Sequence, residues 1–210
     1  MKKVRASKRQ LERYPIYLKL LTSLSEEGEV SISSPNIASL LGYSEEQVRK
    51  DLQTVTSRKG QPKRGRNIKE LINDISDFLG YDKPTMTILV GSGHLGQAFL
   101  NFEGFNEVGL NIVAVFDTDE ELIGNHINNI PIYDVHEMEQ FIKKNKIEIA
   151  ILTIPSSVAL ETALKLQKYG IKAIWNFAHV HLNLGQDVIV ENVNLASSLA
   201  ILSYQLRDFK

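Results

Sequence analysis

The sequence contains no cysteine among its 210 residues. This absence excludes disulfides, thiol nucleophiles, cysteine-based metal sites and thiol redox switches, so any response to redox state would need a bound molecule. Long apolar runs are also missing. None approaches the roughly 18 residues of a membrane-spanning helix, and no apolar segment follows the basic first residues as in a secretory signal. We therefore expect a cytoplasmic protein with no membrane partner.

Neither sign of charge is in large excess over the whole chain, which has a formal net charge of −1. The balance is uneven along the chain, because residues 1–82 hold 15 of the 24 lysines and arginines but only 11 of the 25 acidic residues. A basic first part joined to an acidic remainder predicts a polyanionic partner for the first part alone.

A glycine-rich turn stands near the middle of the chain, directly after the apolar run at 85–90. It reads Gly91, Ser92, Gly93, His94, Leu95 and Gly96, the G-x-G-x-x-G pattern between a predicted strand and a predicted helix. The first glycine permits a tight turn, the second lets the backbone approach a pyrophosphate, and the third lets helix and strand pack closely. Backbone N–H groups at the helix start then face the phosphates. This stretch predicts a dinucleotide-binding site.

Asp117 strengthens this interpretation, since it lies 21 residues after Gly96 at the end of a second apolar strand, residues 112–116. A carboxylate there accepts hydrogen bonds from the adenosine ribose hydroxyls and repels a 2′-phosphate, which favours NADH and NAD+ over their phosphorylated forms. The alternatives are a turn that has lost its ligand, or one that holds another nucleotide such as coenzyme A.

Strands and helices alternate after Asp117. Helices are predicted at 136–145 and 156–169, and buried strands at 147–153 and 171–177. This order predicts a parallel, doubly wound sheet of the Rossmann type, in which ligands bind at the carboxyl ends of the strands. The residues at those ends that we expect to form the far wall of the cofactor site are Thr153, Ile154, Pro155, Asn176 and Phe177.

The first part of the chain has the pattern of a helix-turn-helix. A helix is predicted at 8–25, with Pro15 expected to kink it or delay its start, and the cap Ser34 begins a short second helix. After a glycine turn, Ser44 caps a third helix at 45–55. The side chains that this third helix would present to a DNA groove are Ser44, Gln47, Arg49 and Lys50.

Residues 58–66 follow that helix, and five of the nine are basic, interrupted by two glycines and a proline. The segment is too short and too rich in turn residues for a helix, and it fits the wing of a winged helix that grips phosphates. Its candidate phosphate contacts are Lys59, Lys63, Arg64 and Arg66. The basic residues within 1–9 fit either an arm that reaches DNA or a solvated terminus.

The tail has an apolar stripe on its predicted helix, with leucine or phenylalanine at positions 195, 199, 202, 206 and 209. Such steps of four and three residues make a seam that must be buried, either against a second copy of the chain or on its own domain. We divide the chain into a DNA-binding domain at 1–82, a nucleotide-binding domain at 83–192 and a dimerisation helix at 193–210.

No catalytic constellation accompanies the nucleotide motif. A dehydrogenase needs an acid–base residue beside the nicotinamide, and the only candidates are His179 and His181. Two histidines two residues apart could also bind a metal, but no third ligand is evident. The sequence thus predicts a binding protein and no enzyme. The alternatives are a small NAD-dependent oxidoreductase and a DNA-binding regulator with a vestigial or altered pocket.

This order of elements resembles the Rex family of redox-sensing transcriptional repressors over essentially the whole chain. The matching stretches are 13–21 (RYPIYLKLL), 47–52 (QVRKDL), 64–65, 89–95 (LVGSGHL), 116–119 (FDTD), 149–155 (IAILTIP), 176–178 (NFA) and 191–193 (ENV). The resemblance implies an α/β chain with an N-terminal winged helix-turn-helix domain, a C-terminal Rossmann-like doubly wound parallel sheet and a domain-swapped C-terminal helix. It also implies a homodimer that represses fermentation genes from double-stranded operator DNA when NADH is scarce, and releases the DNA when NADH binds.

The departures from the pattern of that family include four positions at which the resemblance implies a role in sensing the nucleotide. The resemblance implies a switch between an arginine of the first helix, a tyrosine after the glycine turn and an aspartate at the start of the last helix. The residues at those positions are Lys19, Phe102 and Asn194, and Leu195 stands where an aromatic residue approaches the nicotinamide from the partner's helix. Lysine and asparagine form no ion pair and phenylalanine donates no hydrogen bond, so we expect weakened discrimination of NADH from NAD+.

Overall fold

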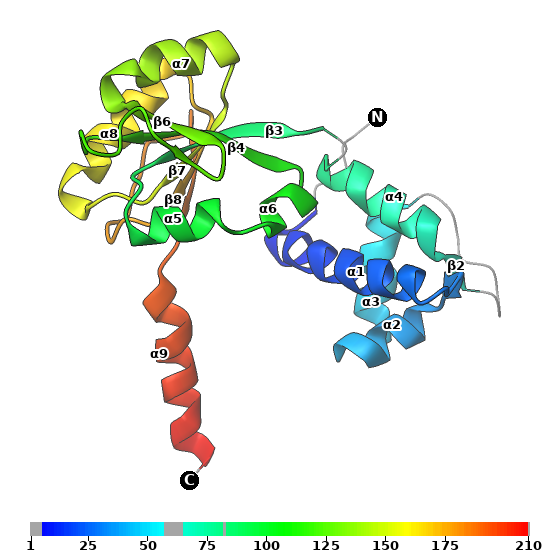
Figure 1. The fold of residues 1–210 in the computed structure, drawn as a ribbon. Coiled ribbons are helices and arrows are strands. Elements are labelled where there is room, and N and C mark those ends of the chain that lie inside the picture. Colours follow the sequence, from blue (N-terminus) through cyan, green and yellow to red (C-terminus); the bar gives the residue numbers. More distant parts are fainter. Residues whose placement is uncertain (1–5, 57–64, 82, 210) are drawn as a thin grey trace. The chain divides into compact units, whose positions relative to one another are not determined.

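The structure is a computed structural model that describes residues 6–56, 65–81 and 83–209. The chain divides into two compact units, Met1–Lys83 and Pro84–Lys210, which we describe one at a time. Figure 1 follows the elements of both units along the sequence. None of the helices within the described ranges has the length and apolar character needed to cross a membrane.

The first unit is a group of helices with a small two-stranded sheet. Its described helices are α1 (Lys8–Glu26), α2 (Ser34–Leu41), α3 (Glu45–Val55) and α4 (Ile68–Leu79). Each follows a cap residue whose side chain accepts the N–H three positions on, as Ser44 accepts that of Gln47. The apolar faces of the helices meet in one core, which includes Tyr14, Tyr17, Leu21, Val48, Leu52, Leu71 and Ile75.

The first helix begins as predicted, whereas the start of the second differs from the expectation by one residue. The cap of α2 is Ser33 and not Ser34, because the Ser33 hydroxyl accepts the N–H of Asn36 and places Ser34 inside the first turn. Pro15 lies inside α1, which begins at Lys8, so the proline does not delay the start of the helix. Pro15 has no backbone N–H to donate to a hydrogen bond within the helix. The helix stays continuous there because Tyr14 and Tyr17, on either side of the proline, pack in the core.

The small sheet pairs β1 (Ser31–Ile32) with β2 (Arg66–Asn67) in antiparallel register. Gly65 precedes β2 with a φ of +72°, and a Cβ there would lie 2.5 Å from the carbonyl oxygen of Ile32. Only glycine fits so close to a neighbouring backbone in that conformation. Arg66 is half-buried in β2. The other predicted wing contacts, Lys59, Lys63 and Arg64, lie outside the described residues.

Residues 84–209 of the second unit contain a seven-stranded sheet in the order β5-β6-β4-β3-β7-β8-β9. Neighbouring strands are parallel except for β5 and β6. The chain enters at β3 in the middle, builds outward through β4 and β6, and then builds outward on the other side from β7 to β9. The winding direction therefore reverses between β3 and β7. The strands are β3 (Thr85–Val90), β4 (Leu110–Asp117), β5 (His126–Ile127), β6 (Ile130–Asp134), β7 (Ile149–Leu152), β8 (Ala173–Asn176) and β9 (Ile189–Asn192).

Helices cover both faces of this sheet. Figure 1 shows α5 (His94–Leu100) on one face, and α7 (Met138–Asn145) and α8 (Ser156–Tyr169) on the other. Alternate residues of β3 serve the two faces, since Ile88 packs in the core with α7 and α8 while Leu89 packs in the core with α5. The strand is thus buried on both sides, which confirms the predicted doubly wound sheet. The shorter described helices of this region are α6 (Gly104–Glu107) and the 3-10 turn η1 (Val135–Glu137).

The observed strands differ from the predicted strands mainly at their ends and at one edge. β7 and β8 are shorter than the apolar stretches 147–153 and 171–177. β9 carries no clear sequence signal, because its residues alternate between partly buried and exposed and Ile189 is 75% exposed. A short, half-exposed edge strand leaves no apolar run to detect.

The C-terminal helix consists of α9 (Leu195–Gln205) and the 3-10 turn η2 (Leu206–Phe209). No residue of α9 is buried. The apolar stripe is exposed along its whole length, from 60% at Leu195 to 88% at Phe209. A continuous apolar surface of this kind marks an interaction site, so the stripe needs a cover that the described residues of one chain do not provide.

Candidate nucleotide site and DNA-binding helix

A cavity of about 800 Å³ opens where β3, β4 and β7 end, at the point where the winding of the sheet reverses. Ligands of doubly wound sheets bind at this place. The predicted site residues that line the cavity are Gly91, Gly93, Asp117, Thr153, Ile154 and Pro155. The remaining residues of the glycine turn, together with Asn176 and Phe177, are not part of the lining.

The glycine turn is packed against the backbone of neighbouring strands. Gly91 has a φ of +97°, and a Cβ there would lie 2.7 Å from the carbonyl oxygen of Thr153. A Cβ on Gly96 would lie 2.2 Å from the carbonyl oxygen of Gly91, to which the Thr153 hydroxyl also donates a hydrogen bond of 2.7 Å. Gly93 differs, because a Cβ there would meet nothing within 4 Å. Two of the glycines serve packing, and Gly93 keeps space open.

We expect Gly96→Ala to lower the free energy of unfolding of the second unit by about 2–3 kcal/mol, because the new methyl group overlaps a backbone oxygen that cannot move freely. Gly93→Ala is the matched control, since its φ of −63° and its open surroundings accept a methyl group. It should keep the wild-type stability and weaken nucleotide binding. Urea unfolding measures both variants. Equal losses of stability in the two would contradict this division of roles.

Asp117 ends β4 beside the glycine turn and is held by several donors. Its Oδ2 accepts the backbone N–H of Ser92 at 2.6 Å and the Ser92 hydroxyl. Its Oδ1 accepts the N–H groups of Thr118 and Asp119, at 2.7 and 3.1 Å. Burial acts to raise the pKa of Asp117, but these hydrogen bonds outweigh burial and hold the pKa below its ordinary value. The carboxylate is therefore ionised and positioned at the cavity wall.

Asn176, which we expect at the cofactor site, has a side chain that is hydrogen-bonded within the protein. Its side chain is fully buried, and its amide nitrogen donates to the carbonyl oxygen of Val180 at 2.8 Å and to Oδ1 of Asn192 at 2.9 Å. Its own Oδ1 accepts the N–H of Ala178 at 3.0 Å. The side chain thus ties β8 to β9 and to the following loop. Phe177 packs in the core against the ring of Phe99, with centroids 4.7 Å apart.

The other residues of the turn have separate surroundings. Ser92 is fully buried against Asp117, and Leu95 packs partly into the core on the α5 side. His94 is exposed at the start of α5. His179 and His181 are exposed as well, and no three His, Asp or Glu side chains among the described residues gather as a metal site would require.

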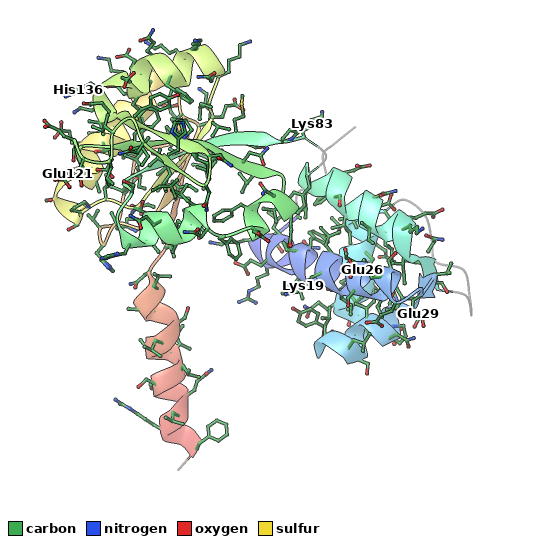
Figure 2. All side chains as sticks on the ribbon, viewed as in Figure 1. Lys19, Glu26, Glu29, Lys83, Glu121 and His136 are labelled. Atoms are coloured by element: carbon green, nitrogen blue, oxygen red, sulfur yellow. The ribbon has the colours of Figure 1, made fainter. Side chains whose placement is uncertain are left out.

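Several cavity residues carry no motif in the sequence. Val135 and His136 follow β6 just as Thr118 follows β4, so they too lie at the carboxyl end of a strand (Figure 2 labels His136). The rule that ligands bind at the carboxyl ends of parallel strands would have predicted Val135 and His136 from the sequence. Val158 and Tyr169 lie on α8 and reach the cavity only because this helix packs on the sheet.

α3 carries the predicted DNA-reading side chains on its exposed side. Arg49 pairs with Glu45, and Lys50 pairs with Glu46 at 2.8 Å, each one helical turn away. All four side chains are exposed, and ion pairs of this kind contribute little to stability, so a phosphate can replace the acid. α1, α3 and their cap residues share a shallow hollow of about 490 Å³, lined by Ser7, Arg9, Gln10, Arg13, Ser44, Glu46, Gln47, Lys50 and Asp51.

A buried polar cluster joins α3 to α1 behind that surface. Asp51 is 1% exposed, and Arg13 donates to both of its carboxylate oxygens, at 2.7 and 2.8 Å. Tyr17 donates to Oδ2 at 2.8 Å, and Tyr14 donates to the backbone carbonyl of Asp51 at 3.1 Å. The hydrogen bond to Asp51 raises the pKa of Arg13, while burial and the same carboxylate raise the pKa of Tyr17. The cluster therefore holds one ion pair and two neutral phenols.

Only one feature of the sequence marks this cluster. Asp51 lies on the apolar face of α3 between Val48 and Leu52, where a charged residue needs a buried partner. The partners lie 34 to 38 positions earlier in the chain, so the sequence pattern of α3 alone does not name them.

Two family models match the chain. The family described as "CoA binding domain" matches residues 82–180, and the family described as "Putative DNA-binding protein N-terminus" matches residues 6–53. The first match falls on the unit that holds the cavity, and the second falls on the unit that holds α3.

Curated relatives named redox-sensing transcriptional repressor Rex match nearly the whole chain. The relative from Thermoanaerobacter pseudethanolicus is 39% identical over 207 residues, which cover 99% of this chain and 92% of the relative. The relative from Clostridioides difficile is 40% identical over 200 residues, which cover 95% of each chain.

Solved structures give the same result. The crystal structure of RSP in complex with β-NAD+ and operator DNA matches with a TM-score of 0.91 at 39% identity, over 98% of this chain and 94% of that one. The crystal structure of RSP in complex with β-NADH matches with a TM-score of 0.86 at 38% identity, over 98% of this chain and 96% of that one. Because these matches run through both units, the chain belongs to the Rex family of redox-sensing transcriptional repressors.

Proposed function

We propose that the protein represses transcription as a homodimer that binds double-stranded operator DNA and leaves it when NADH occupies the cavity. The observation that carries this proposal is the presence, in one chain, of a cavity at the reversal point of a doubly wound sheet and of a helix-turn-helix unit. The similar protein RSP has been crystallised with operator DNA and with β-NADH, which supports the same ligands here. We place the protein in the cytoplasm and assign it no catalytic role.

The cavity residues fit NADH and NAD+. Gly93 keeps open space where a pyrophosphate would approach the turn. The ionised carboxylate of Asp117 suits ribose hydroxyls and disfavours the ribose phosphates of NADPH and coenzyme A, because like charges repel. The bound dinucleotide would supply a redox-dependent signal and no reaction. The proposed contacts are Gly91, Ser92, Gly93, His94, Leu95, Gly96, Asp117, Thr153 and Pro155, with Asn176 holding β8 in place.

The DNA contacts that we propose combine base reading with phosphate binding. Gln47 on α3 can read adenine in the major groove, and the cations hold the phosphates. The proposed set is Ser44, Gln47, Arg49, Lys50, Lys59, Lys63, Arg64 and Arg66. A dimer joined through α9 would offer two such sets to half-sites one helical turn apart.

The test is fluorescence anisotropy of the full-length protein with duplexes from the upstream regions of fermentation genes. We expect saturating NADH to weaken binding at least about tenfold, because NADH must bind the DNA-free arrangement more tightly than the DNA-bound one. Lys50→Ala should lower the slope of log affinity against log salt by about 1, whereas Lys143→Ala on α7 should leave the slope unchanged. Equal binding with and without NADH would contradict the proposal. NADH turnover with a simple carbonyl substrate would favour the oxidoreductase alternative.

Discrimination between NADH and NAD+ should be weaker than the family pattern implies. The side chain of Asn194 caps α9 by accepting the N–H of Ala196 at 3.1 Å. Because this amide is uncharged, it cannot form the ion pair with Lys19 that an aspartate could form. Lys19 is exposed on α1 (Figure 2), and the ring of Phe102 packs on Phe105 without a hydroxyl to donate. We expect calorimetry to give NADH an advantage over NAD+ of less than about a hundredfold.

A triple variant provides the reverse test. Lys19→Arg, Phe102→Tyr and Asn194→Asp together restore a charged pair and a donor, so the preference for NADH should rise at least about tenfold. Lys143→Arg, a lysine replacement on α7 away from the cavity, should leave the preference unchanged. A preference of a hundredfold or more in the unaltered protein would refute the expectation.

A further inference from the structure

The carboxylate of Asp117 has no acceptor position left for a ligand. An ionised carboxylate offers about four positions for donors. Four donors already occupy them, namely the N–H groups of Ser92, Thr118 and Asp119 and the hydroxyl of Ser92. Asp117 nevertheless lines the cavity and is the group best suited to accept the ribose hydroxyls. A nucleotide must therefore displace one of the existing donors to use it fully.

The four donors differ in how easily they can leave. Three are backbone N–H groups, and moving any of them would move the glycine turn or the end of β4. The Ser92 hydroxyl can leave by rotation about a single side-chain bond. Ser92 is 0% exposed, so no solvent competes for this hydroxyl while it lies on Asp117. Its carbonyl oxygen accepts a hydrogen bond of 3.0 Å from Gln97 of α5, which holds the backbone of the turn in place.

We propose that the Ser92 hydroxyl competes with the adenosine ribose for the carboxylate of Asp117, and that Ser92 thereby lowers the affinity and the ribose selectivity of the cavity. This inference rests on the proposed function. In the unaltered protein a ribose hydroxyl forms one hydrogen bond and breaks another, so the net gain is small. With alanine at position 92, the same ribose hydroxyl meets a free acceptor and the gain is complete.

A different role for Ser92 predicts the opposite sign. If the hydroxyl turned toward the pyrophosphate and donated to it, removal of the hydroxyl would weaken nucleotide binding. The two roles are therefore separated by the direction of one measured change.

The experiment is isothermal titration calorimetry of full-length wild type and Ser92→Ala with NADH and with 2′-deoxy-NADH. We expect Ser92→Ala to bind NADH about three- to tenfold more tightly than wild type. Wild type should prefer NADH over 2′-deoxy-NADH by less than about threefold, and the variant by about three- to tenfold more than wild type. The matched control is Thr87→Val, which removes a buried hydroxyl from the middle of β3, outside the lining of the cavity, and should leave both affinities within about twofold.

The possible results of these titrations separate failure of this inference from failure of the proposed function. A folded Ser92→Ala that binds NADH equally or more weakly overturns the inference and leaves the proposed function intact. Urea unfolding without nucleotide reports whether the variant folds, and if it does not, the wild-type preference decides alone. In that case a preference for NADH over 2′-deoxy-NADH above about threefold overturns the inference. If wild type binds neither NADH nor NAD+, the proposed function fails and this inference fails with it.

Discussion

Asp51→Ala should lower the free energy of unfolding of the first unit by about 3 kcal/mol and abolish operator binding. The substitution removes the shared acceptor of Arg13 and Tyr17 from the interior of the unit. The guanidinium, whose side chain is only 16% exposed, then lacks its counter-charge, and the buried phenol lacks its partner. Leaving buried donors unsatisfied is more costly than the hydrogen bonds themselves are stabilising.

The two units can be followed separately in this measurement. The only tryptophan of the chain, Trp175, lies in β8 of the second unit, so its fluorescence reports that unit, while circular dichroism reports both. Glu46→Ala is the control on the same helix, because it breaks an exposed ion pair and should change stability by less than about 0.5 kcal/mol. Tyr17→Phe removes one neutral donor and should lie between the two, at about 1 kcal/mol.

We expect the proposed operator binding to depend on the same cluster for a geometric reason. The cluster joins α1 to the buried side of α3, and thereby sets which side chains of α3 face away from the core. If α3 rotated or shifted by a fraction of a turn, the proposed contact of Gln47 with a base edge would be lost. If Asp51→Ala unfolded within about 1 kcal/mol of wild type and kept its operator affinity, the cluster would have no such role.

The second large effect concerns α9. Leu199→Asp combined with Leu202→Asp should convert the proposed dimer to a monomer and reduce affinity for a two-half-site operator more than about a hundredfold. Both leucines lie in the middle of the exposed stripe, at 68% and 61% exposure, and a charge in a buried seam carries a large desolvation penalty. A monomer engages one half-site and loses the effective concentration that a linked second domain provides.

Light scattering measures the mass of the variant, and anisotropy measures its affinity for DNA. Ser197→Asp adds one charge on the opposite side of the same helix, two residues from Leu195 and Leu199, and should keep both the mass and the affinity. The proposal of a dimer joined through α9 would be lost if the double variant kept the mass of a dimer. It would also be lost if Ser197→Asp dissociated the protein as readily.

Much of the fold follows from local patterns in the sequence. The predicted helices at 45–55 and 156–169 have the observed bounds of α3 and α8, because each is delimited by neighbouring residues such as Ser44 and Gly170. The ends of the strands are predicted less well, and β9 escapes prediction because it is a short edge strand whose residues alternate between partly buried and exposed. Strand pairing is a property of two segments, whereas a helix satisfies its backbone within one segment.

The candidate site was predictable to the same extent and for the same reason. The spacing of the glycines and of Asp117 along the chain predicts their place at the cavity. The rule that ligands bind at the carboxyl ends of parallel strands predicts Thr153 and Pro155. Asn176 follows the same rule and was expected at the site, but its amide is used between β8 and β9. Whether a polar side chain at a strand end faces a cavity or a neighbouring loop depends on which loop packs there.

Local patterns along the chain are sufficient to predict the class of the fold, the order of its two units and the residues of the nucleotide turn, because caps, glycines and apolar periods act over a few positions. The folded structure was needed to show that residues of α1 bind Asp51 and that the Ser92 hydroxyl donates to Asp117. It also showed that no part of one chain's described residues covers the stripe of α9. These facts depend on donors and acceptors brought together from distant segments, and no local pattern encodes which of them meet.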